Sequence, residues 1–175
     1  MVLGIGLGSA LGLTATIVHV FNHALMKGAL FMALGALAYR VGSTRMHKIR
    51  GLGRQMPWTF AAIFIAGLSL IGVPGTAGFI SKWYLVLAAI EQQSWLIAMI
   101  ILAGSLLAVA YMWNLIEALF FQQPEPRAEP VREAPLSMLV PMWLLVIANI
   151  WFGLDTGLTV GIAETAVQLL GVNGT

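Results

Sequence analysis

Three titratable side chains recur at intervals of four residues in an otherwise apolar stretch. His19, His23 and Lys27 lie in the segment VHVFNHALMKGALF at residues 18–31. Four helical residues rise about 6 Å and turn by about 400°, so the three side chains share one helix face. Histidine exchanges protons near neutral pH, and a lysine inside a membrane marks a function or a buried partner. The pattern predicts a row of proton-transfer groups.

Two other interpretations of this row stay open. In the first, the histidines form hydrogen bonds between helices and Lys27 extends towards the membrane surface. That extension is long. Arg40 marks the polar end of the apolar run 11–40, and it lies about 20 Å from Lys27 along a helix. In the second, the two histidines bind a metal. The sequence HVFNH lacks the glutamate of an HExxH site, and the chain has no cysteine, so we predict no metal site.

The composition places this row in a membrane protein. Hydrophobic residues make up 59% of the 175 residues and charged residues only 9%, against about 25% charged in soluble domains. The lack of cysteine excludes disulfides, thiolate-held iron–sulfur clusters and thiol catalysis. We therefore predict an all-α integral membrane protein surrounded by a lipid bilayer, with no cofactor and no nucleic-acid partner.

Apolar segments predict about four to five transmembrane helices after a partial first helix at residues 1–8. The spans are expected at 11–40, 57–93, 94–121 and 136–154. The first is long enough to tilt, to extend beyond the membrane or to be interrupted near its polar centre. Residues 157–170 are too short to span and predict an interfacial helix or a loose tail. This divides the chain into a translocating part (1–121), a polar loop (122–135) and a C-terminal helix with its tail (136–175).

The segment 57–93 contains a second candidate site beside a helix break. As one straight helix it would measure about 55 Å, too long for one crossing. Pro74, Gly75 and Gly78 predict a break near 74–78, although a hairpin of two short helices also fits. Lys82 follows the break by four residues. In a broken helix it is a candidate proton carrier at mid-membrane, whereas in a hairpin it is a surface anchor.

A basic loop gives the orientation. Arg45, Lys48, Arg50 and Arg54 cluster within residues 41–55, which predicts that this loop faces the cytoplasm. Counting spans from there places the loop 122–135 on the same side of the membrane.

These motifs together resemble a known family. HVFNHALMKGALF, GLGRQMP and GLSLIGVPGTAGFISKW, in this order, resemble the proton-translocating, antiporter-like membrane subunits of respiratory complex I. They resemble equally the D-type subunit of the multisubunit Mrp-type sodium/proton antiporters, and relatives occur in membrane-bound hydrogenases. The resemblance covers about residues 1–121. It implies a fourteen-helix subunit of two inverted repeats, of which this chain, a C-terminal fragment, holds most of the second.

The resemblance also implies roles for the candidate residues. Lys82 matches the charged carrier on the second broken helix, Lys27 the central lysine of the preceding helix, and His19 and His23 the histidines beside it. The first repeat's glutamate–lysine pair has no counterpart in this chain.

The function implied is that of a membrane subunit in a multisubunit cation/proton antiporter of a bacterial or archaeal cell membrane. Protons would move along a mid-membrane axis of lysines, histidines and water, with sodium as a candidate exchanged ion and other membrane subunits as partners. No catalytic chemistry is expected within the chain. Two alternatives stay open: a proton-pumping subunit of complex I or of a membrane-bound hydrogenase, and a structural scaffold without its own ion path.

Overall fold

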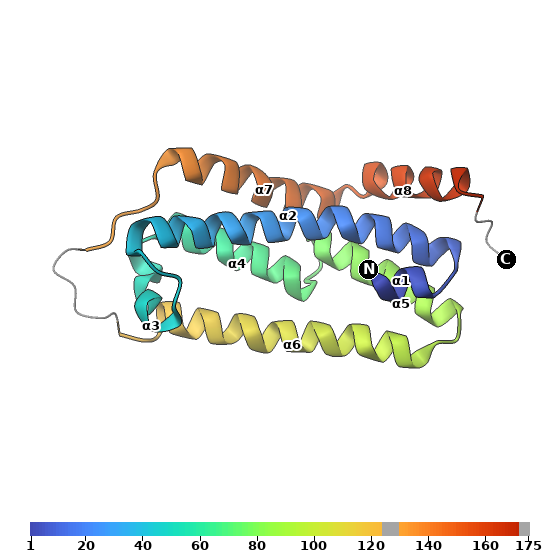
Figure 1. The fold of residues 1–175 in the computed structure, drawn as a ribbon, viewed down its shortest axis with the longest axis horizontal. Helices are drawn as coiled ribbons and strands as arrows, with labels where there is room; N and C mark the ends of the chain where they lie inside the picture. The colour runs from blue at the N-terminus through green and yellow to red at the C-terminus, as the bar shows by residue number, and fades with distance from the viewer. Residues whose placement is uncertain (124–129, 172–175) are drawn as a thin grey trace.

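A computed structural model describes residues 1–123 and 130–171, and the regular structure in these ranges is helical (Figure 1). The α-helices are α1 (Val2–Gly6), α2 (Ala10–Val41), α3 (Met46–Ile49), α4 (Pro57–Ile71), α5 (Ala77–Glu91), α6 (Trp95–Phe120), α7 (Leu136–Leu154) and α8 (Gly157–Leu169), and a 3₁₀ turn covers Leu52–Arg54.

Three helices of the described part are long and apolar enough to cross a membrane: α2, α6 and α7, with 32, 26 and 19 residues. The all-helical membrane class predicted from composition is thereby confirmed, and these three correspond to predicted spans. Helix α2 is continuous, which excludes one of the three alternatives for this span, an interruption near its polar centre. At 1.5 Å per residue it is about 48 Å long, well beyond a hydrocarbon core of about 30 Å.

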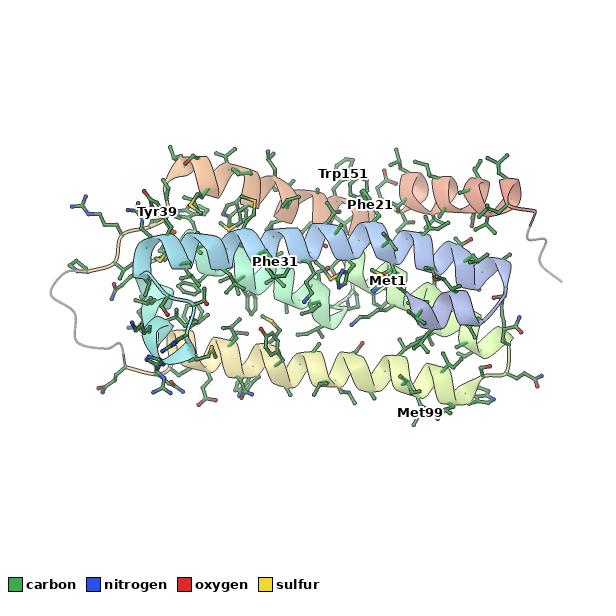
Figure 2. The ribbon with its side chains drawn as sticks, viewed as in Figure 1. Met1, Phe21, Phe31, Tyr39, Met99 and Trp151 are labelled. Atoms are coloured by element: carbon green, nitrogen blue, oxygen red, sulfur yellow. The ribbon has the colours of Figure 1, made fainter. Side chains whose placement is uncertain are left out.

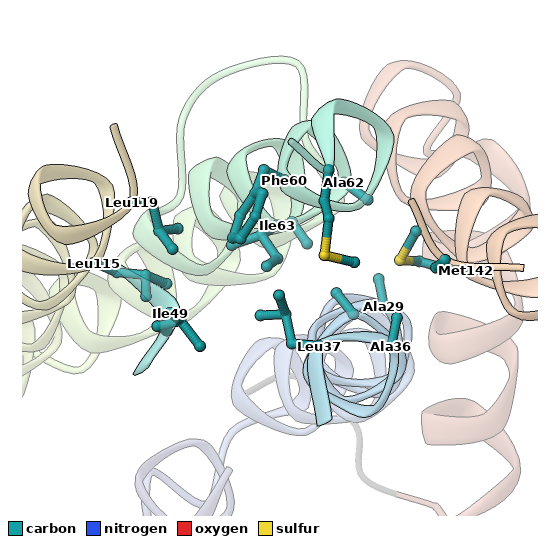
Figure 3. Close-up of a cluster of buried hydrophobic side chains, with 14 of the residues drawn as sticks. Ala29, Ala36, Leu37, Ile49, Phe60, Ala62, Ile63, Leu115, Leu119 and Met142 are labelled. Carbon is teal, nitrogen blue, oxygen red and sulfur yellow. The ribbon is translucent and has the colours of Figure 1, made fainter. Parts of the chain in front are cut away.

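Helix α2 is the element around which the others pack. Helices α4, α5, α7 and α8 pack directly against it, α7 also contacts α4 and α5, and α6 packs against α4 and α5 (Figure 1). Figure 3 shows the larger buried cluster, in which Leu37 of α2 packs near Phe60 and Ile63 of α4. Leu115 of α6 belongs to the same cluster. Small residues on α2, among them Ala33 and Ala36, are fully buried and allow close helix contact.

The predicted helix break is observed, with α4 and α5 lying end to end along α2 (Figure 1). That the two half-helices together cross the membrane once stays a prediction. Helix α4 packs against the C-terminal half of α2, as the shared cluster of Leu37 and Phe60 shows. Helix α5 packs against the N-terminal half, where Asn22 donates to Ala77 O at 2.7 Å. A hairpin would have placed α4 and α5 side by side, so that alternative is excluded.

The C-terminal segment forms a helix, in line with the first of the two alternatives predicted for it; that this helix lies at the membrane interface stays a prediction. Residues 157–169 form helix α8, which continues from α7 along α2 (Figure 1). Val160 and Ala163 of α8 are buried against Val18 of α2. The segment is therefore part of the helix bundle, and a loose tail is wrong. Periodicity within 157–169 did not reveal this, because the contact depends on Val18, which lies far away in the sequence.

The basic loop and the described ends of the second polar loop, residues 122–123 and 130–135, lie at the same end of the bundle, as predicted (Figure 1). Val131 N donates to Gln55 Oε1 at 2.8 Å, and Gly51 N donates to Ala118 O at 3.0 Å. The first contact joins the two loops directly. The second joins the basic loop to the end of α6. That this end faces the cytoplasm stays a prediction.

Candidate functional site

The four predicted proton-transfer residues line one cavity, whereas the predicted break residues Pro74, Gly75 and Gly78 are not part of its wall. His19, His23 and Lys27 of α2 and Lys82 of α5 lie on the wall of a space of about 690 Å³ whose other wall is α6. The two histidine rings lie 5.6 Å apart, centroid to centroid, tilted by 46°. Apolar side chains such as Leu85 and Leu107 make up most of the remaining wall. The structure thus brings the row on α2 and the lysine after the break to one place.

The α4–α5 break binds the amine of Lys82. Its Nζ donates to Leu70 O at 2.7 Å, to Ile71 O at 2.9 Å and to Ser105 Oγ at 3.0 Å. Leu70 and Ile71 are the last residues of α4, whose carbonyl groups lack partners within the helix and carry the negative end of its dipole. The end of α4 therefore supplies two of the three acceptors of Lys82, and α6 supplies the third.

Glycines shape the break. Gly72 and Gly75 have φ angles of 94° and 87°, a left-handed conformation that favours glycine. Pro74 lies exposed in the turn between them. Gly78, in the first turn of α5, packs directly against Ser69, and a Cβ there would overlap the Ser69 carbonyl. Gly75 and Gly78 were predicted as break residues, whereas Gly72, which ends α4, was missed.

A buried polar network supports the break on the side away from the cavity. Ser69 Oγ donates to Asn149 Oδ1 of α7 at 2.8 Å and accepts from Gly78 N at 3.0 Å. Asn22 on α2 donates to Ala77 O. Ser69, Asn22 and Asn149 are fully buried. None of the three was predicted as a site residue, although each is a polar residue inside an apolar segment, which is the signal that would have identified it.

His19 connects the cavity to this break. Its Nδ1 lies 2.8 Å from Ser81 Oγ, and Ser81 Oγ lies 3.2 Å from Gly78 O, to which it donates. One arrangement satisfies both contacts: the Ser81 hydroxyl donates to Gly78 O, and the His19 ring donates through Nδ1. In that tautomer Nε2 carries the lone pair that could accept a proton.

A second cavity adjoins the first. It measures about 510 Å³, and Lys27, Leu70 and Tyr111 line both spaces. Its other residues include Thr44, Met46 and Ile49, which belong to the loop end of the bundle. Lys27 therefore lies between the cavity of Lys82 and the end of the bundle that carries the basic loop.

The outer surface of α6 is apolar. Leu102, Leu106 and Trp113 are exposed there, and Figure 2 shows Met99 pointing away from the bundle. Such a surface is compatible with lipid or with a neighbouring membrane helix.

The sequence and the fold both match known proteins. Residues 1–108 match the family model described as "NADH:quinone oxidoreductase/Mrp antiporter, TM". The N subunit of NADH-quinone oxidoreductase from Desulforudis audaxviator is 39% identical over 166 residues, which is 88% of this chain and 33% of that protein. The D-type subunit of the Na(+)/H(+) antiporter from Alkalihalophilus pseudofirmus is 32% identical over 153 residues, 87% of this chain and 31% of that protein.

A solved structure matches the fold. A chain in the Mrp complex from Dietzia sp. DQ12-45-1b superposes with a TM-score of 0.86 at 24% identity, over 94% of this chain and 39% of that one. The chain thus spans about a third of the length of these relatives. That it holds the second of two inverted repeats stays a prediction.

Proposed function

This chain belongs to the NADH:quinone oxidoreductase/Mrp antiporter transmembrane family, and on that premise we propose that it is the part of a membrane subunit that moves protons along a row of lysines and histidines. The groups are Lys82, His19, His23 and Lys27. No covalent chemistry is required, because each step passes a proton between nitrogen atoms through water.

The shared cavity is the observation that carries this proposal. All four groups line a space of about 690 Å³, which has room for many water molecules. Among the described residues no direct hydrogen bond joins Lys27 to Lys82, so a proton would pass between them through this water and the two histidines. The adjoining cavity of about 510 Å³ extends from Lys27 towards the basic loop. It supports a route between the row and that end of the bundle.

Lysine suits this task for a physical reason. An ammonium inside a membrane is costly unless it has partners, and Lys82 has three, two from the end of α4 and one from α6. These partners are carbonyl and hydroxyl oxygens, and no carboxylate of the described residues lines the cavity. Lys82 can therefore lose its proton without leaving an unpaired buried negative charge beside it.

We propose a multisubunit cation/proton antiporter in a bacterial or archaeal cell membrane as the setting, with other membrane subunits as partners. The relative from the Na(+)/H(+) antiporter of Alkalihalophilus pseudofirmus supports it. A proton-pumping subunit of an NADH:quinone oxidoreductase is the second candidate, because the relative named as the N subunit of such an enzyme is 39% identical. Proton movement along the cavity is common to both settings.

The test replaces the two lysines in the full-length subunit within its complex. Lys82→Ala and Lys27→Ala are expected to lower proton flux in everted membrane vesicles at least tenfold, a typical loss for a group that transfers a proton. Arg54→Ala, which removes an exposed basic side chain of the loop, is the control and should retain flux. Both lysine variants should assemble, as checked by native gel electrophoresis. Wild-type flux in both would exclude the proposal, and loss of assembly would favour the scaffold alternative.

A further inference from the structure

The amine of Lys82 has a partner for each of its hydrogens. An ammonium group carries three N–H donors and no acceptor. In the structure the three acceptors are Leu70 O, Ile71 O and Ser105 Oγ, at 2.7, 2.9 and 3.0 Å. The site is therefore complete for the protonated lysine, with two acceptors from the end of α4 and one from α6.

The three partners differ in what they can do once the proton has left. A neutral amine has two N–H donors and one lone pair, so one of the three contacts loses its hydrogen. Leu70 O and Ile71 O are carbonyl oxygens and can only accept. The Ser105 hydroxyl both donates and accepts. Its own hydrogen is held by a long contact of 3.4 Å to Ile101 O, which is weak by geometric criteria.

We propose that Ser105 is a positioning residue that holds the Lys82 amine at the end of α4 in both protonation states. It accepts a hydrogen bond from the ammonium, and after proton loss its hydroxyl turns from Ile101 O and donates to the Nζ lone pair. The two carbonyls keep the remaining N–H groups. The Lys82 side chain then stays at the cavity wall throughout a cycle, ready to be protonated again.

This inference rests on the proposed function, in which Lys82 is a proton carrier. The other titratable side chains on the cavity wall are His19, His23 and Lys27 from α2 and Tyr111 from α6. These side chains line the same cavity, but none of them forms a described hydrogen bond with Lys82 Nζ. The described hydrogen bonds of Nζ go to the end of α4 and to Ser105. Ser105 also provides the polar contact between α6 and the break.

Two substitutions separate this role from packing. Ser105→Thr keeps a hydroxyl, which in a helix bonds to the carbonyl four residues earlier, as Ser105 does. Ser105→Ala removes the hydroxyl but is smaller. We expect Ser105→Ala to lower proton flux about tenfold in the full complex, the size of one hydrogen bond to a charged group. We expect Ser105→Thr to stay within about twofold of wild type. Packing alone predicts the reverse order, because the added methyl group is what would disturb it.

The control is Ser94→Ala at the start of α6, where the hydroxyl donates to Gln92 O instead; it should leave flux unchanged. Lys82→Ala is measured alongside. If Lys82→Ala keeps wild-type flux, the proposed function fails. If Lys82→Ala abolishes flux but Ser105→Ala does not lower it, the proposed function stands and the role of Ser105 is wrong.

A second measurement does not depend on transport. Ser105→Ala is expected to lower the thermal midpoint of the complex in the wild-type background and to have little further effect in the Lys82→Ala background, since the contact is then already absent. Equal losses in both backgrounds would show that Ser105 acts independently of Lys82 and would overturn the inference.

Discussion

Lys82 and Glu133 bind opposite ends of the same helix, α4. The Lys82 ammonium meets the last carbonyls, Leu70 O and Ile71 O. Glu133, from the loop before α7, accepts from Trp58 N at 2.8 Å and from Thr59 Oγ1 at 2.6 Å at the first turn. Each charge has the sign that the helix dipole favours at its end. Neither residue belongs to α4, so tertiary contacts fix this half-helix at both ends.

Replacing Glu133 tests the N-terminal contact. Glu133→Gln keeps the shape but places an amide donor where a carboxylate oxygen now accepts from α4. We expect a loss of about 1–2 kcal/mol in stability, the usual cost of losing a charged helix cap. The measurement is the thermal midpoint of the detergent-solubilised complex. Glu164→Gln, on an exposed face of α8, is the matched control, and equal midpoints for both variants would contradict the capping role.

Lys82→Arg separates positive charge from proton exchange. Guanidinium keeps its donors for the α4 carbonyls but does not release a proton in the working pH range. We expect the complex to assemble while proton flux falls at least tenfold. Flux in everted vesicles and native gels measure the two properties. If Lys82→Arg transports like wild type, the charge is sufficient and Lys82 is not a proton carrier.

Ser69→Ala tests the network behind the break. The substitution removes the partner of Asn149 Oδ1 and of Gly78 N, leaving buried polar groups without hydrogen bonds. We expect a loss of about 1–3 kcal/mol, seen as a lower thermal midpoint. Thr165→Ala on α8, where an exposed hydroxyl donates to Gly161 O, is the control. A midpoint as high as that of the control would show that the network does not stabilise the break.

Replacing Gly153 with alanine tests whether α7 packs closely against the break. A Cβ at this position would come within 2.5 Å of Thr76 Cα and 2.6 Å of Ala77 N. These are backbone atoms, so α7 would have to move, and we expect Gly153→Ala to reduce assembly of the complex. A Cβ at Gly161 of α8 meets nothing within 4 Å. Gly161→Ala should therefore assemble normally. Equal amounts of assembled complex for the two variants would show that α7 does not pack closely against the break at Gly153.

Much of the site follows from local sequence. The four-residue spacing of His19, His23 and Lys27 sets them on one face of any helix. Pro74, Gly75 and Gly78 predict an interruption in a helix through 57–93. The scarcity of charge requires a membrane environment. These are local properties of chain geometry and solvation, so they need no knowledge of distant contacts.

The partners of these residues were decided by tertiary structure alone. That Lys82 binds the end of α4 and Ser105, that Ser69 meets Asn149, and that Glu133 closes α4 all depend on which helices lie side by side. Helix α8 shows the same limit, because its place along α2 depends on the contact of Val160 and Ala163 with Val18. Periodicity fixes the face of a helix, but it carries no information about what that face meets. In this chain, the packing of α2, α5 and α6 decides that the titratable row on α2 and Lys82 after the break line the same cavity.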